Sequence, residues 1–430
     1  MSKGKNVGIV GEKRALVDKA LDAIDEFKLI SILRNLIMIP GYNGHEDKKA
    51  DYVLREMERR DLEIVENYID VGRNRRNVIG ILRGEGTGKT LMLCAHHDTR
   101  WPHDGETGQH EARVEGDKIY GLGTGDSMPP TAVMFAVVDA IKRANIKLKG
   151  DLILLSSADE MCFKDGARVL EENGIKADYC IMGEATDFNI GVVHTGKAEV
   201  EITTRGRLPK TYDIAVFAER MGEHPVNAIL SMNTIINYLR RAQKEDPFFQ
   251  QTHPLLPGKG AAINFGTIIG GSRGDGDPTK NPGRGENDFG LAKRVPTWCK
   301  MRVGARHWPG QTAEEFRDTI QKWVDKAKEE NPDIDATIEL YLDHGNDPFV
   351  CPEDAEIVGI MRKVIKHSID KDPDLVGMIF SSEGPFYQRA GMEFVYCCPP
   401  SRGSIGEYIT KEELMKLARI WTAAAVYCTT

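Results

Sequence analysis

The stretch LMLCAHHDTR, residues 91–100, ends an apolar run on two histidines and an aspartate. Two later apolar runs end in the same way: DLILLSSADEM at 151–161 and DYCIMGEAT at 178–186 are followed by Glu160 and Glu184. Continuous apolar runs are typical of strands buried in a parallel sheet, and such sheets bind ligands at the carboxyl ends of their strands. These segments therefore predict an α/β fold with a site at one edge of its sheet.

Helical periodicity fills the chain around these strands. Apolar residues recur at helical spacing over 14–38, 45–60, 131–144 and 165–173, and a last helix is expected near 410–427. Strands that alternate with helices predict a central, mostly parallel sheet covered by helices.

A different pattern occupies the middle of the chain. Residues 197–205 alternate with a period of two, and the expected elements that follow are a helix at 226–241, strands at 261–269 and 298–305, a helix at 312–329 and a strand at 335–342. This is the order of a split βαβ, ferredoxin-like α+β domain. We therefore predict a discontinuous domain, 1–197 and 345–430, with a second domain, 198–344, inserted in it. The long loop at 270–292 is either functional or disordered.

Composition excludes several classes of protein. The 57 Lys and Arg against 65 Asp and Glu give a net charge of −8, which argues against nucleic acid as the main partner. No apolar run approaches the length of a membrane span, and the first residues carry no apolar signal segment. The eight cysteines include no CxxC and are expected to be reduced thiols. We therefore expect a cytoplasmic protein with no membrane partner.

Four short segments carry side chains suited to metal chemistry. They contribute His96, Asp126 in GLGTGDS, Glu160 and Glu184. Taken singly each is weak evidence, because an aspartate after glycine is usually a turn former and an acidic pair at a strand end is usually solvated. Their order, each after an apolar run, favours a divalent ion held by one imidazole and two carboxylates, with positions left for water.

At this point the sequence resembles the M20 metallopeptidase family over nearly its whole length. The matching motifs are HxD at His96-His97-Asp98, the metal-bridging aspartate of YGLGTGD at Asp126, the DEE motif at Asp159-Glu160-Met161, and the GEP(T/S) glutamate at Glu184. The resemblance implies that His96, Asp126 and Glu184 bind metal, that Asp98 orients His96, and that Glu160 is the general base.

The departures from the family pattern concern one of its two metals. The second glutamate of DEE, which holds that metal, is Met161, and a thioether is a poor ligand for a hard ion. The histidine that the family places before its closing Glu-Tyr is missing from SRGSIGEY at 401–408, and no histidine follows His367. We therefore predict one divalent metal per chain, Mn or Zn. Arg402 is expected to occupy the space of the absent ion.

The resemblance also suggests candidates for substrate binding. NAI at 227–229 and the Arg306-x-x-Pro-Gly pattern resemble the family's dimerisation domain, which implies a homo-oligomer, by default a dimer. The histidine that the family presents before NAI is absent from AVFAER at 215–220, so His224 either takes its role or is a surface residue. His194 either binds substrate near the metal or packs at a strand end. Arg306, Arg389 and Arg402 are candidates to clamp a substrate carboxylate, with a surface salt bridge as the alternative for Arg389.

These features predict a metal-dependent C–N hydrolase. With a single ion, amide hydrolysis has less support, so we expect attack on an electrophilic carbon of a small anionic aromatic or acyl substrate with release of ammonia or an amine. Deamination of an electron-poor aromatic amine is the leading hypothesis, because the pattern resembles that of single-metal aminohydrolases within the family. Two alternatives remain: a two-metal aminoacylase or exopeptidase, and a non-catalytic binding protein on the same scaffold.

Overall fold

The structure is a computed structural model that describes residues 8–70, 72–210, 221–258, 260, 263–272, 294–342, 346–402 and 405–430. The stretch at 215–220 and most of the predicted loop at 270–292 lie outside these residues.

The chain divides into two compact units. The first runs to Val193 and also contains Phe349–Met378 and Ser382–Thr430, whereas the second contains His194–Pro348 and Ile379–Ser381. The predicted insertion, 198–344, is four residues shorter than the second unit at each end. The short return of the chain at Ile379–Ser381 has no counterpart in the prediction.

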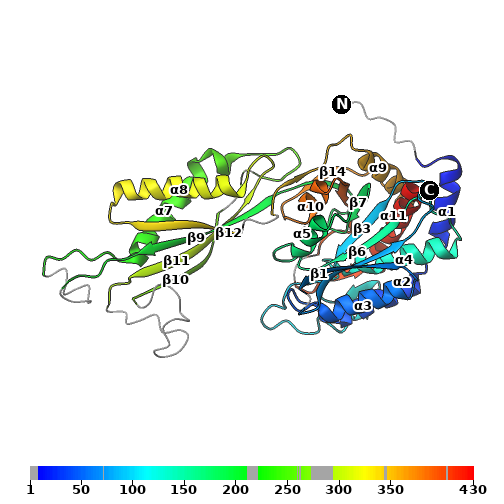
Figure 1. Cartoon of the computed structure of the whole chain (residues 1–430), viewed down its shortest axis with the longest axis horizontal. Helices are drawn as coiled ribbons and strands as arrows, with labels where there is room; N and C mark the ends of the chain where they lie inside the picture. The colour runs from blue at the N-terminus through cyan, green and yellow to red at the C-terminus, as the bar shows by residue number, and fades with distance from the viewer. Residues whose placement is uncertain are drawn as a thin grey trace. The chain divides into compact units, whose positions relative to one another are not determined.

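A mixed sheet forms the core of the first unit (Figure 1). Its four central strands, which are mutually parallel, are β6 (Leu152–Ser157), β3 (Leu91–His96), β7 (Tyr179–Met182) and β15 (Glu393–Tyr396). Every residue of β3, β6 and β7 is buried, as their apolar runs predict. The predicted α/β class with a mostly parallel centre is therefore confirmed.

The edges of this sheet depart from the parallel pattern. At one edge lie β2 (Arg75–Leu82) and β1 (Glu63–Asp70), each antiparallel to its inner neighbour. The other edge begins with β8 (Ile190–His194), antiparallel to β15, and continues with β13 (Phe349–Val350) and β14 (Leu375–Met378). A separate small sheet contains β4 (Val114–Glu115), β5 (Lys118–Tyr120) and β16 (Tyr408–Thr410).

Helices cover both faces of the large sheet (Figure 1). Pairs α4 with α11 and α5 with α10 lie on opposite sides of it. The helices of this unit are α1 (Gly11–Asp22), α2 (Glu26–Met38), α3 (Asp47–Glu58), α4 (Met128–Arg143), α5 (Asp165–Glu172), α9 (Glu356–Ile369), α10 (Gly384–Arg389) and α11 (Lys411–Thr429). The single helix predicted at 14–38 is two helices, because the Asp25 side chain accepts the Lys28 N–H and starts a new helix there.

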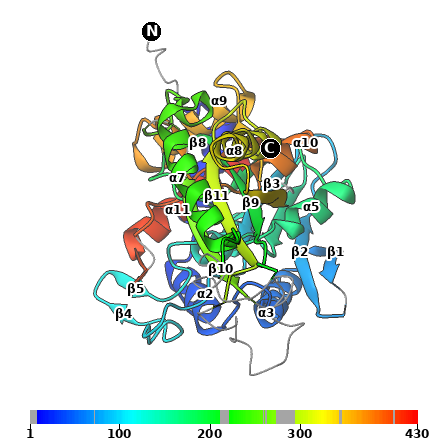
Figure 2. The ribbon, with the colours of Figure 1, turned by 90° about the vertical axis from the view of Figure 1, so that its left-hand side faces the viewer.

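The second unit has the predicted split βαβ order. Its elements are β9 (Gly196–Arg205), α7 (Ala228–Glu245), the 3₁₀ turn η1 (Pro247–Gln250), β10 (Ile263–Gly271), β11 (Trp298–His307), α8 (Ala313–Glu330) and β12 (Asp335–Leu342). The sheet order is β10-β11-β9-β12 and all three pairings are antiparallel. Both helices contact each other and the sheet, on one face of it (Figure 2). The ferredoxin-like α+β prediction is confirmed.

Two further sequence predictions concern membranes and cysteines. Among the described residues, no helix combines the length and the apolar character needed to cross a membrane. All eight cysteines are free thiols, and only Cys162 is exposed.

In the part of the chain that the structure describes, one buried lysine of the first unit, Lys49, has no carboxylate hydrogen-bond partner. Lys49 of α3 is 0% exposed, and its Nζ lies 3.4 Å from the sulfur of Met128. Burial lowers its pKa to about 7, although the Asp98 charge opposes the change. The unfolded chain, with an ordinary lysine pKa, therefore binds this proton more tightly than the folded protein does.

Replacing Lys49 with methionine should therefore stabilise the protein. The lysine costs stability wherever the unfolded chain is protonated and the folded one must either lose the proton or bury the charge, which holds below about pH 10. We expect K49M to raise the free energy of unfolding by about 2 kcal/mol near pH 7.5 and the difference to shrink towards pH 10. Urea unfolding at both pH values measures it. The exposed neighbour Lys48 supplies the control, K48M, for which a comparable gain would contradict the burial argument.

Candidate metal centre

The carboxyl ends of the central strands bring the predicted ligands together. His96 ends β3, Glu184 follows β7, and Asp126 lies in the loop before α4. One ligand atom from each lies within 4.8 Å of the others, and His96 Nε2 is 2.8 Å from Asp126 Oδ1. Parallel strands β3 and β7 are neighbours, so their ends meet at the same edge of the sheet.

The electrostatics of this cluster suit a bound cation. His96 and Glu184 are buried and Asp126 is half-buried. Burial, followed by the charges of Asp126 and Glu160, raises the pKa of Glu184 well above its usual range. Burial disfavours a charged His96 imidazole, yet Asp126 raises its pKa well above the ordinary value. An anionic pocket that draws a proton onto its histidine offers the donor set and the charge that a divalent ion requires.

Asp98 connects the predicted metal-binding histidine, His96, with the predicted base, Glu160. Its carboxylate accepts the backbone N–H groups of Glu160 and Met161 at 3.1 and 3.0 Å, and the Asn43 amide at 3.0 Å. It also lies 3.4 Å from His96 Nδ1, whose hydrogen bond goes to the Asp98 carbonyl oxygen at 2.9 Å. Asp98 is fully buried, so these bonds fix both the imidazole and the turn that carries the base.

A second buried aspartate, Asp159, also fixes the turn that carries Glu160. Asp159, which has a left-handed backbone at φ 66°, accepts hydrogen bonds from Asn43 at 2.9 Å and Arg75 at 2.8 Å. Arg75 in turn pairs with the buried Glu46. The Asn43 side chain thus donates to both Asp98 and Asp159. The sequence around Asn43 contains no motif that would predict this role.

Glu160, the predicted base, is 5% exposed and lies beside a buried lysine. Lys164 Nζ donates to a Glu160 carboxylate oxygen at 2.5 Å and also to the Glu160 backbone carbonyl. Burial raises the pKa of Glu160, and the Lys164 charge is the largest influence that opposes the rise. A carboxylate with a raised pKa near a metal cluster is suited to accept and return a proton.

Comparison with known proteins decides the family. Residues 92–427 match the profile of peptidase family M20/M25/M40. The chain belongs to this family. It is 25% identical over 330 residues to an acetylornithine deacetylase from Edwardsiella ictaluri, which covers 74% of both chains.

Solved structures show the same fold. The aminopeptidase PepT of Bacillus cereus superposes with a TM-score of 0.71 at 18% identity, covering 94% of this chain and 99% of that one. The YXEP protein of Bacillus subtilis, described as a dinuclear metal-binding peptidase of the M20 family, gives 0.64 at 13% identity and covers 93% of this chain and 97% of that one. The family is therefore a metallo-hydrolase family, and the match supports a hydrolase here.

This M20 chain has a cavity where the family pattern expects the missing ligand. Met161 lines a cavity of about 310 Å³ together with Asp126. Its other lining residues are Thr99, Arg100, Leu122, Gly125, Ser401 and Glu407. Among the described residues, His96, Asp126 and Glu184 form the one cluster of three or more metal-binding side chains.

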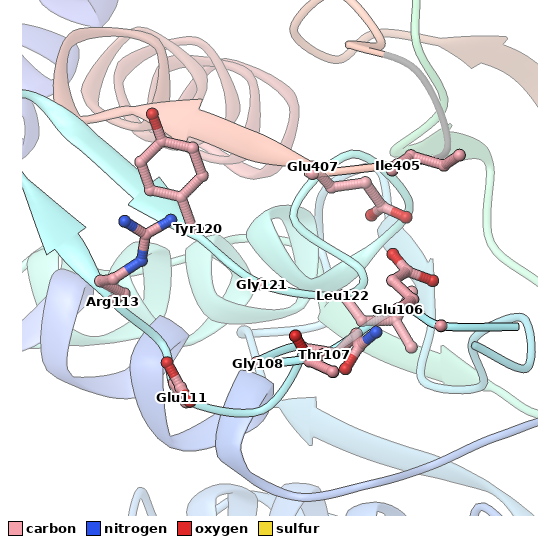
Figure 3. Close-up of a pocket in the computed structure, with 13 residues that line it drawn as sticks. Glu106, Thr107, Gly108, Glu111, Arg113, Tyr120, Gly121, Leu122, Ile405 and Glu407 are labelled. Atoms are coloured by element: carbon pink, nitrogen blue, oxygen red, sulfur yellow. The ribbon is translucent and has the colours of Figure 1, made fainter. Parts of the chain in front are cut away.

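An ion-pair cluster that the sequence did not reveal contributes Arg100 and Glu407 to the lining of this cavity. Arg100 pairs with Glu106 at 2.8 Å and with Glu407 at 3.2 Å. Glu407 is nearly buried and accepts the Gly123 N–H at 2.8 Å. A larger neighbouring cavity, of about 460 Å³, shares Leu122 and Glu407, and its walls are drawn in Figure 3, where the carboxylates of Glu106 and Glu407 face each other.

Two predicted arginines are engaged elsewhere. Arg402 pairs with Glu413, donates to the Tyr408 hydroxyl at 3.1 Å and lies over the Tyr408 ring. Its charge is therefore neutralised beside the start of α11, and its placement in the space of the absent ion stays a prediction. Arg389 pairs with Glu171 at 3.0 Å on the surface, which is the contact expected under the alternative stated for it, and its role as a substrate clamp stays a prediction.

The remaining candidates lie in the second unit. Arg306 donates to Ser381 at 2.9 Å, and His194 is buried with its Nδ1 2.9 Å from the Thr195 carbonyl oxygen. His224 is exposed, and its carbonyl oxygen accepts a hydrogen bond from Arg207. All three residues belong to the second unit, and their roles towards the metal centre of the first unit stay predictions.

Proposed function

We propose that the protein is a single-metal C–N hydrolase that deaminates an electron-poor aromatic amine bearing a carboxylate, with 5-nitroanthranilate as the leading specific substrate. The observation that carries the proposal is the donor set. Within the described residues one His/Asp/Glu cluster is formed, and Met161 stands at the position of a carboxylate ligand for a second ion. An ion pair, Glu160 with Lys164, lies in the same turn.

Separate residues are proposed to bind the metal, to position the side chains and to transfer the proton. His96, Asp126 and Glu184 would hold a divalent ion, Mn or Zn, which supplies Lewis acidity and lowers the pKa of water. Asp98 keeps the imidazole and the Glu160 turn in register. Glu160 accepts a proton from the attacking water as the new C–O bond forms, and its raised pKa suits it to pass the proton on.

The net reaction is balanced by water alone. Addition of the water oxygen to the ring carbon places negative charge on the ring and its electron-withdrawing substituent. Glu160 then delivers its proton to the amine nitrogen, the C–N bond breaks, and ammonia leaves while the ring recovers its aromaticity. An activated ring carbon needs less stabilisation of a localised oxyanion than an amide carbonyl does, so it suits a site with one ion.

Amide hydrolysis is the second candidate, and the similarity to an acetylornithine deacetylase favours it. That relative's name describes removal of an acetyl group from an amine. In this case the same base would activate water against an amide carbonyl, and the two products would be a carboxylate and an amino acid. The similarity at 25% identity supports a C–N hydrolase and fits amide hydrolysis better than it fits deamination of an aromatic amine.

A substrate panel with metal analysis tests the proposal. The purified protein, loaded with Mn or Zn, is assayed for ammonia release from aminobenzoates with and without a nitro group, and for amine release from N-acyl amino acids including N-acetylornithine. We expect ammonia from the nitro-substituted aminobenzoate and one ion per chain. Turnover confined to N-acyl amino acids with two ions per chain would establish the amide reaction instead. Binding without any turnover would favour the non-catalytic alternative.

Assembly and location remain proposals. We propose a homodimer formed through the second unit, with a small anionic substrate as its partner, and a cytoplasmic location.

A further inference from the structure

We propose that the ammonium of Lys164 is a built-in cation that takes over, at the general base, the charge that a second metal ion would supply. The inference rests on the proposed function in one respect, the assignment of Glu160 as the base. It makes Lys164 a positioning residue that acts through Glu160.

The contacts of Lys164 place its charge at the base. The residue is 4% exposed, and its Nζ donates to both the carboxylate and the backbone carbonyl of Glu160. Taking an ammonium out of water is costly unless it is paired, so the pair with Glu160 is what keeps this lysine charged inside the protein. Burial alone would lower the pKa of Lys164, but Glu160, followed by Glu383 and Glu184, raises it.

Charge balance gives the cation a reason to be there. The two carboxylate ligands, Asp126 and Glu184, and the base Glu160 carry three negative charges when ionised. One divalent ion would neutralise two of these three charges and the Lys164 ammonium the third, a count that leaves aside the buried Asp98 and Glu383. With Met161 in place of a carboxylate, the turn has one anionic ligand fewer and one internal cation, which matches a site for a single ion.

The backbone at Lys164 shows that the side chain is held there at a cost. Lys164 immediately precedes α5 and adopts a left-handed conformation with φ 61° and ψ 28°. This conformation is unfavourable for a residue other than glycine. The turn nevertheless carries a lysine at this position, and its Nζ contacts Glu160, four residues earlier.

Removing the charge should affect metal binding and catalysis in opposite directions. Without the ammonium the site is more anionic wherever Glu160 is ionised, so at a pH above the acid limb K164M should bind Mn or Zn about tenfold more tightly than the wild type. Its base should be protonated over more of the pH range, so kcat at pH 7 should fall more than tenfold, with the acid limb of the pH–rate profile displaced to higher pH. The other charged groups around Glu160 are His96, Asp98, Asp126, Glu184 and Glu383, and all are left in place.

The experiment measures the metal dissociation constant by titration calorimetry and the pH–rate profile on the full chain. K164R, which keeps the charge, should stay close to the wild type in both measurements. K164Q, which keeps a hydrogen-bond donor but no charge, replaces K164M if that variant does not fold. K176M, which changes an exposed lysine beyond the same helix, is the matched control and should change neither quantity.

Two results would overturn the inference: unchanged or weaker metal binding in both uncharged variants, or an acid limb that does not move. A lysine with a purely structural role would weaken metal binding or leave it unchanged, and would lower kcat equally at every pH. Failure of the proposed function would appear differently, as absent ammonia release by the wild type. It would leave the metal-affinity measurement fully interpretable.

Discussion

Replacing Glu160 with glutamine should lower kcat by roughly 10²–10⁴-fold while the metal stays bound, because the amide keeps the shape of the side chain and cannot accept the proton. The Glu160 side chain is not part of the ligand cluster, so the metal content after gel filtration should match the wild type. The wild-type rate should fall as the pH drops through the raised pKa of Glu160, and this acid limb should disappear in E160Q.

The same substitution leaves the Lys164 ammonium buried without its anion, so the melting temperature of E160Q should also fall. Activity is therefore compared at a temperature at which both proteins are folded. E172Q, a change of an exposed glutamate on α5, is the control for the loss of a carboxylate and should be as active as the wild type. If E160Q retained more than about a tenth of the wild-type kcat, another group would be the base.

Replacing His96 with alanine should abolish metal binding at micromolar ion and, with it, turnover. Loss of a group that merely supports a ligand costs 10–100-fold in metal affinity, so loss of the ligand itself should cost at least about 100-fold. Metal content by mass spectrometry and calorimetric titration both measure the effect. The wild type should bind one ion per chain, and chelation followed by readdition of one equivalent should restore activity.

The next residue in the chain supplies the control. His97 is fully buried, and its Nδ1 lies 3.0 Å from the Ser156 hydroxyl instead of in the cluster. Burial lowers its pKa to about 3, so it is neutral and adds no charge to the site. H97Q should bind metal within a few-fold of the wild type. Equal losses of metal in H96A and H97Q would mean that the strand end, and not a specific imidazole, determines binding.

Much of the fold could be predicted because burial imposes a simple pattern. The apolar runs that become β3, β6 and β7 are buried throughout, and their order places His96, Glu160 and Glu184 at one edge of the sheet. The βαββαβ order of the second unit is equally evident in its alternating strands. The break before α2 was missed because apolar periodicity continues through it, and only the capping interaction of Asp25 ends one helix and begins another.

The site was predicted less completely, for a physical reason. Ligands at strand ends follow from the topology, whereas charge partners depend on side-chain directions that the sequence does not specify. Arg402 was expected in the space of the absent second ion, and nothing in the sequence indicated that its guanidinium pairs with Glu413, eleven residues further along the chain. Lys164 was overlooked, because nothing in the sequence signals that its ammonium contacts Glu160, four residues earlier.

The hydrogen bonds of Asp98 have a consequence for how this enzyme can vary. One carboxylate contacts the imidazole proposed to bind the ion and, through two peptide N–H groups, holds the turn that carries the proposed base. The positions of the proposed Lewis acid and of the proposed Brønsted base are therefore coupled, and a displacement of one would also displace the other. The substrate specificity can therefore change, in evolution or by engineering, while Asp98 is retained. Changing the metal site and the base independently would first require replacing the hydrogen bonds through which Asp98 links them.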